Sequence, residues 1–125
     1  MLEKNITEEN IEKFVINFYT KILKDDIVGP FFIDILGDDM NNKKWQEHIE
    51  TLCDFWASVT LGHRSYVGSP FAPHRQIQGL EKETFYRWLE IFFETLDEIY
   101  EQDISLKFKE TGSIMAQNFM RNLRI

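Results

Sequence analysis

Apolar side chains recur every three or four residues along most of this 125-residue chain. The recurrence is clearest in one early stretch, where they stand at Ile11, Phe14, Val15, Phe18, Tyr19, Ile22 and Leu23. This spacing places them on one face of an α-helix, because a helical turn takes about 3.6 residues. No segment shows the sustained alternation of apolar and polar residues that is typical of a half-buried strand. The sequence therefore predicts an all-α fold.

Capping residues, glycines and prolines divide this pattern into four substantial helices and two short ones. Thr7 is a suitable N-cap for the first, because its side-chain oxygen can accept a backbone N–H. Pro30 suits the first turn of a short helix, and Gly37 suits its end. The predicted elements are a helix from Thr7 to near Lys24, a short helix at 30–36, a helix at 43–61 capped by Asn41 or Asn42, a turn around 72–77, a helix whose apolar face runs from Phe85 to Tyr100, and a last helix from near Asp103 to Leu123.

The last helix contains a glycine in its interior. Gly112 interrupts the last helix, at a cost of about 1 kcal/mol relative to alanine. Close packing against another helix would explain its presence.

The predicted inner face of the helix at 43–61 consists of Trp45, His48, Ile49, Leu52, Phe55, Trp56 and Val59.

The composition is that of a globular protein, and we expect one domain over residues 1–125. The net charge of −7 argues against binding to nucleic acid or to anionic membrane surfaces, both of which attract basic proteins. No apolar run approaches the roughly 20 residues of a membrane-spanning helix. The N-terminus lacks the basic and then apolar pattern of a secretion signal. We expect a cytoplasmic monomer.

Several chemistries of helical proteins have no counterpart in the sequence. None of the three histidines follows a glutamate at the spacing of a di-iron site, and there is no His-Glu-x-x-His zinc motif. The glycines form no phosphate-binding loop, and no serine stands in a nucleophile elbow. Cys53, the only cysteine, lies among apolar residues, where a thiol is inert.

Three polar aromatic residues interrupt the apolar faces of three different predicted helices. They are Tyr19, His48 and Trp88. Taken singly, each is more often a core residue whose polar group is satisfied than a functional one. Together they could supply hydrogen-bond donors to a single pocket, where a low dielectric strengthens each bond.

A second histidine, His74, lies in a short segment with Pro70 and Pro73 between the last two of these helices. His63, by contrast, follows Gly62 at a helix end, where it can interact favourably with the helix dipole. One imidazole from a short, anchored segment is what a five-coordinate haem iron requires. Donors on the opposite side would stabilise the partial negative charge of bound O₂.

With these residues in place, the sequence resembles the group III truncated haemoglobins from about Ile6 to Leu123. The markers keep their order and spacing across the chain. They are Phe18-Tyr19, the turn Gly29-Pro30-x-Phe32, Trp45-Gln46-Glu47-His48, Phe55-Trp56, His74, Phe85 and Trp88-Leu89.

The resemblance implies a shortened globin, a two-over-two helical sandwich, that binds haem b. His74 would be the proximal iron ligand, and Tyr19, His48 and Trp88 would form the distal site. Residues implied to contact the macrocycle or shape its pocket are Phe32, Trp45, Leu52, Phe85 and Leu89. Candidate partners of the haem propionates, chosen for their closeness in sequence to His74 and because guanidinium pairs well with carboxylate, are Arg64, Tyr66 and Arg75.

The implied function is the binding of O₂ and other diatomic ligands, with nitric oxide, CO and cyanide as ligands in vitro. Several donors converging on one ligand would slow its release, which suits redox chemistry better than oxygen transport. Peroxidase-like activity and nitric oxide dioxygenase activity are the candidate reactions, and both need an electron donor that the sequence does not identify. The alternative is a cofactor-free helical domain that binds a protein partner. A haem sensor is a third option, although nothing resembles an attached output domain.

Overall fold

The computed structural model describes residues 1–62 and 77–125. Within these residues the chain forms five helices and no β-strand beyond an isolated bridge between Glu3 and Tyr100. The helices are α1 (Glu8–Lys24), α2 (Gly29–Leu36), α3 (Lys43–Leu61), α4 (Lys82–Ile99) and α5 (Gln102–Leu123). The prediction of an all-α fold is confirmed, and the turn expected around 72–77 falls almost entirely outside the described residues.

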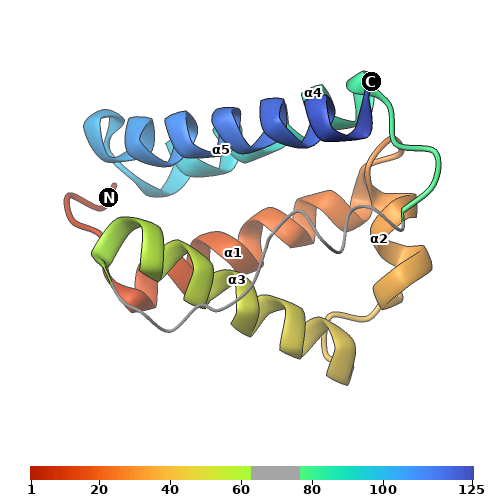
Figure 1. The fold of residues 1–125 in the computed structure, drawn as a ribbon. Coiled ribbons are helices and arrows are strands. Elements are labelled where there is room, and N and C mark those ends of the chain that lie inside the picture. Colours follow the sequence, from red (N-terminus) through yellow and green to blue (C-terminus); the bar gives the residue numbers. More distant parts are fainter. Residues whose placement is uncertain (63–76) are drawn as a thin grey trace.

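The helices are stacked in two layers. Figure 1 shows α4 and α5 side by side in one layer, with α1 and α3 in the layer beneath and α2 at one end. Helix α1 is central, because it contacts α2, α3 and α4. This is the two-over-two arrangement that was predicted.

Local capping chemistry explains where the helices begin. The Thr7 side chain accepts the backbone N–H of Asn10 at 3.1 Å, and the Asn10 side chain accepts the Thr7 N–H in return at 2.9 Å. At α3 it is Asn42 rather than Asn41 that accepts the Trp45 N–H, at 2.8 Å. Helix α3 ends at Gly62, whose φ of 73° lies in the left-handed region that glycine adopts readily.

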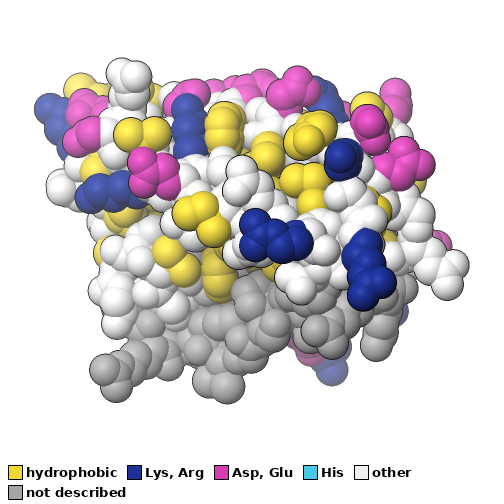
Figure 2. All heavy atoms as spheres, turned by 45° about the horizontal axis from the view of Figure 1, so that its top comes forward, with side chains coloured by type: hydrophobic (Ala, Val, Ile, Leu, Met, Phe, Trp, Pro, Cys, Tyr) yellow, Lys and Arg dark blue, Asp and Glu magenta, His cyan; other side chains and the backbone are white. Residues whose placement is uncertain are grey.

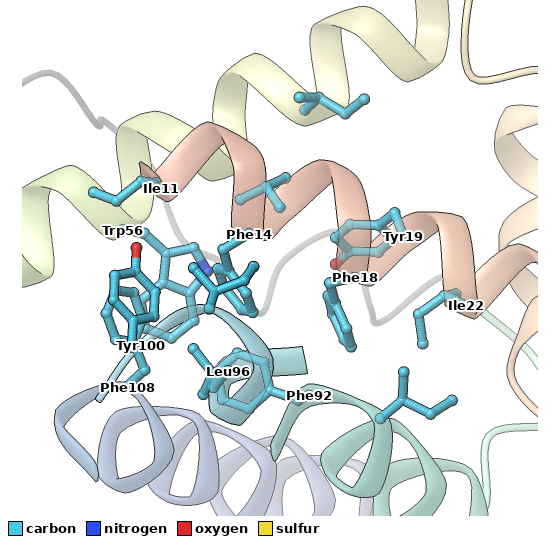
Figure 3. Packing of buried hydrophobic residues seen from close by; sticks show 14 of the residues in the cluster. Ile11, Phe14, Phe18, Tyr19, Ile22, Trp56, Phe92, Leu96, Tyr100 and Phe108 are labelled. Atoms are coloured by element: carbon cyan, nitrogen blue, oxygen red, sulfur yellow. The ribbon is translucent and has the colours of Figure 1, made fainter. Parts of the chain in front are cut away.

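The core lies between the two layers and combines aromatic rings with aliphatic side chains. Figure 3 shows side chains from α1 meeting those of α4 and α5 there, with Trp56 of α3 at one edge. The Phe14 ring has edge contacts with Phe92 at 5.5 Å and with Phe108 at 5.6 Å between ring centroids. Edge-to-face packing of this kind is favoured by the charge distribution of aromatic rings.

One residue of the predicted inner face of α3 was assigned wrongly. Val59 is 45% exposed, whereas Trp45, Ile49 and Trp56 are buried. At about 100° per residue, these three align along one line of the helix, and Val59 lies to one side of it. A periodicity of three or four residues is too coarse to separate the centre of a buried face from its margin.

The surface over α4 and α5 has no single chemical character. Figure 2 shows hydrophobic, acidic and basic side chains interspersed on this face. The exposed large hydrophobic residues of the two helices include Tyr86, Leu106 and Ile114. In the described part of the chain, no helix has both the length and the apolar character that crossing a membrane requires.

Candidate functional site

A cavity of about 350 Å³ lies at the end of the molecule where α2 stands. Its volume falls within the range of small-molecule sites, about 300–1,000 Å³. All five helices contribute to its wall, which consists mainly of aromatic and aliphatic side chains. The lining residues are Tyr19, Val28, Phe31, Phe32, Ile35, Leu36, His48, Thr51, Leu52, Phe55, Ile77, Leu80, Thr84, Phe85, Trp88, Met115, Ala116 and Phe119.

The three predicted distal residues meet in this cavity. Tyr19, His48 and Trp88 all line it, although they come from α1, α3 and α4. The Tyr19 ring and the His48 imidazole are 5.3 Å apart between centroids and almost perpendicular, at 81°. The Nε2 atom of His48 is buried. The site therefore offers a phenol, an imidazole and an indole to one cavity.

Burial favours the protonated form of Tyr19. Its side chain is only 4% exposed, and desolvation raises the pKa of its phenol far above the ordinary value, because the charged form loses its hydration. A hydrogen-bonding interaction with the Trp88 side chain offsets part of this rise in pKa. The Tyr19 hydroxyl, which is protonated at physiological pH even without this shift, can donate a hydrogen bond.

Trp45 supports this group of rings from behind without lining the cavity. Its ring stacks on Phe32 at 6.1 Å and 24°, and it has an edge contact with His48 at 5.6 Å. Its indole Nε1 donates a 2.7 Å hydrogen bond to the Gly37 carbonyl, which is next to the end of α2. The Asn42 side chain donates to the Leu36 carbonyl at 2.8 Å. Helix α2 is thereby tied to the start of α3.

The other predicted pocket residues divide into two groups. Phe32, Leu52 and Phe85 line the cavity. Leu89 does not line it, and packs between the two hydrophobic clusters of the core. The predicted iron ligand and propionate partners, His74, Arg64, Tyr66 and Arg75, lie outside the described residues, as does His63. Those assignments remain predictions.

Sequence reasoning missed much of the cavity wall. Met115 and Phe119 stand on α5, where the sequence predicted no pocket residue. Phe31 and Ile35 stand on the short helix α2, where only Phe32 was singled out. Ile35 is exposed although it lines the cavity. Helical periodicity could have found these residues as apolar, but it carries no information on which apolar faces leave a gap between them.

Comparisons with known proteins agree with this geometry. No protein-family model matches the chain. The "Group 3 truncated hemoglobin ctb" of Campylobacter jejuni subsp. jejuni is 30% identical over 120 residues, which cover 96% of this chain and 93% of that protein. This chain belongs to the group III truncated haemoglobins. The crystal structure of a group III truncated hemoglobin from Campylobacter jejuni superposes with a TM-score of 0.90 at 30% identity, over 98% of this truncated haemoglobin and 95% of the other chain.

Proposed function

We propose that this truncated haemoglobin binds haem b in the cavity, with His74 as the iron ligand, and holds O₂ and other diatomic ligands beside Tyr19, His48 and Trp88. The observation that carries the proposal is that these three hydrogen-bonding side chains, from three helices, line one cavity. When bound, haem supplies an iron that takes one protein imidazole and one small ligand.

The cavity wall fits a flat apolar macrocycle. Among the described residues that line it, none is Asp, Glu, Lys or Arg. Phe32, Leu52 and Phe85 provide apolar and aromatic surfaces of the kind that pack on a π-system. In this proposal Trp45 shapes the pocket through Phe32, and Leu89 acts only through the core. Arg64, Tyr66 and Arg75 remain the proposed partners of the propionates.

The donors would retain a ligand that carries negative charge. A phenol is already protonated at neutral pH, and burial raises the pKa of Tyr19 further, while the indole N–H of Trp88 is a donor at every pH. Each charge-assisted hydrogen bond contributes about 1.5–3 kcal/mol. Because each 1.4 kcal/mol corresponds to a factor of about ten, two such bonds would slow ligand release roughly a hundredfold or more.

Slow release is poorly matched to oxygen delivery, so we extend the proposal to redox chemistry. Peroxidase-like activity and the conversion of nitric oxide with O₂ are the two candidate reactions. Both require an external electron donor, which a chemical reductant can replace in an assay. Nitrate formation from nitric oxide, and oxidation of a phenol by peroxide, should each exceed the rate with free haem and fall in Tyr19→Phe. Rates equal to those of free haem would reject the redox role while leaving ligand binding in place.

Absorption spectroscopy tests the haem proposal directly. The purified protein, titrated with haem, should show a Soret band that saturates at one haem per chain. His74→Ala should weaken or shift this band, and the matched variant His63→Ala should leave it unchanged. A protein that takes up no haem would reject the proposal and favour the cofactor-free interaction domain. Equal effects of the two substitutions would reject His74 as the ligand.

A further inference from the structure

Trp88 is held against a buried ring that is not part of the cavity wall. Its indole stacks on Phe92 with ring centroids 4.9 Å apart and an interplanar angle of 15°. Phe92 stacks in turn on Trp56, at 5.5 Å and 27°. Because Trp88 and Phe92 are four residues apart on α4, they share one face of that helix. A three-ring stack thus runs from the cavity into the core.

Phe92 itself has almost no freedom to move. It is completely buried, and Figure 3 shows it in the space between α4 and the side chains of α1. Phe14 and Phe18 each form an edge-to-face contact with it, with centroid distances of 5.5 and 5.6 Å. Its ring orientation is therefore set by neighbours on several sides.

Gly112 on α5 lies directly against the Phe92 ring. A Cβ atom at this position would lie 2.4 Å from Cε2 and 3.0 Å from Cζ of Phe92. Carbon atoms that are not bonded to each other prefer about 3.5–4.0 Å, so any side chain here would displace the ring. The close packing against another helix that was expected at Gly112 is confirmed. The Phe92 ring of α4 is what leaves no room for a side chain at this position.

We propose that Phe92, seated against Gly112, is a positioning residue that orients the Trp88 indole toward Tyr19 and the ligand space. A hydrogen bond weakens steeply as its angle departs from linearity. A rotation of the indole plane would therefore weaken its donation without removing the N–H. The expected effect on ligand release rests on the proposed function. The surroundings of the Trp88 indole can be measured in the protein without haem.

The experiment compares Phe92→Leu and Gly112→Ala with the wild type. Phe92→Leu removes the stacking surface, and Gly112→Ala pushes the ring while improving helix propensity. The first readout is the Trp88 indole N–H resonance in ¹⁵N-labelled protein, identified by its loss in Trp88→Phe and recorded with and without haem. The second readout is the release rate and C–O stretching frequency of bound CO.

The control is Phe108→Leu. Phe108 is as deeply buried as Phe92 and contacts Trp56 at 5.3 Å, but it has no ring contact with Trp88 among the described residues. If the test variants acted only through a general loss of core packing, Phe108→Leu should change the Trp88 resonance and CO release as much as they do. We expect Phe92→Leu and Gly112→Ala to shift the Trp88 resonance and the C–O stretch and to speed CO release several-fold, and Phe108→Leu to change none of them.

Two outcomes would overturn the proposal. One is an unmoved Trp88 resonance in both test variants, and the other is an equal shift in Phe108→Leu. If Phe92→Leu does not fold, Gly112→Ala and the milder Phe92→Met decide the question. A failure of the proposed function gives a different result: the Trp88 resonance still shifts in the test variants, but Trp88→Phe does not alter CO release.

Discussion

The Asp25 carboxylate accepts a 2.7 Å hydrogen bond from Nε of Arg87, which lies 62 residues further along the chain. Its other oxygen accepts the backbone N–H groups of Val28 at 2.9 Å and Ile27 at 3.1 Å. Asp25 follows the end of α1, and Arg87 precedes Trp88 on α4. One carboxylate therefore ties the turn before α2 to the opposite wall of the cavity.

Asp25→Asn should destabilise the fold at neutral pH and have less effect in acid. Partial burial raises the pKa of Asp25, but the hydrogen bonds from Val28, Arg87 and Ile27 outweigh it, so the pKa lies below the ordinary 3.8. The stabilisation is thus present above about pH 4 and is lost as the pH falls through the lowered pKa. Because Arg87 is 38% exposed, we expect a loss of about 1 kcal/mol at pH 7.

Urea unfolding at pH 7 and at pH 3 measures this difference. Glu90→Gln is the matched control, because Glu90 also pairs with Arg87, at 3.0 Å, but its side chain is 65% exposed. It should change the free energy of unfolding very little. An Asp25→Asn effect that is the same at both pH values would contradict the ion-pair explanation.

Tyr19→Phe and Trp88→Phe should each speed the release of O₂ about tenfold to a hundredfold, the effect of losing one charge-assisted hydrogen bond. Both substitutions keep an aromatic ring in place, so the packing around Phe18 is retained. Stopped-flow displacement of O₂ by CO measures the rate. Tyr86→Phe, at an exposed position of α4 that does not line the cavity, removes a hydroxyl and should have no effect. If both site variants release O₂ at the wild-type rate, neither residue is a distal donor.

His48→Ala should speed ligand entry more than ligand release. Ile35 and Thr51 line the cavity and are both exposed, which indicates an opening between α2 and α3. His48 is one helical turn before Thr51 and also lines the cavity, so we predict that its imidazole gates this opening. We expect CO association after flash photolysis to become several-fold faster, with Thr51→Ala as a nearby control that leaves the imidazole in place. Unchanged association in His48→Ala would rule out a gating role.

Cys53 should react slowly with thiol reagents. Burial, followed by the nearby charges of Glu12, Asp54 and Glu50, raises the pKa of its thiol to about 11. At pH 8 the reactive thiolate is then only about one part in a thousand. The reaction with a disulfide reagent should accelerate about tenfold per pH unit up to pH 10, and should become rapid in urea. A folded protein that reacts as fast as glutathione would contradict the raised pKa.

The sequence was sufficient for those features that depend on neighbouring residues. The caps at Thr7 and Asn42 and the stop at Gly62 are local, because each involves atoms within a few residues of the chain. The meeting of Tyr19, His48 and Trp88 is not local. Periodicity placed each on an inner face and suggested a shared pocket, and the resemblance to a family then gave the three residues their specific roles in it.

Contacts between distant residues were beyond sequence reasoning. Nothing in the pattern links Asp25 to Arg87, since both residue types are ordinary on helix surfaces and at helix ends. Trp45 and Leu89 looked alike as pocket residues, yet one braces the rings around His48 and the other packs in the core. Such distinctions depend on the angles at which helices cross, which apolar spacing does not encode.

The hydrogen bonds from Trp45 to Gly37 and from Asn42 to Leu36 have one more consequence. They join the end of α2 directly to the start of α3, on either side of the connection at 38–41. The position of α2 therefore does not depend on the length of this connection. Apart from Met40, which packs against the core and whose carbonyl accepts a hydrogen bond from Gln46, this short connection can therefore change over evolution while the cavity keeps its form. It is also the natural place to insert a tag or a reporter in a working protein.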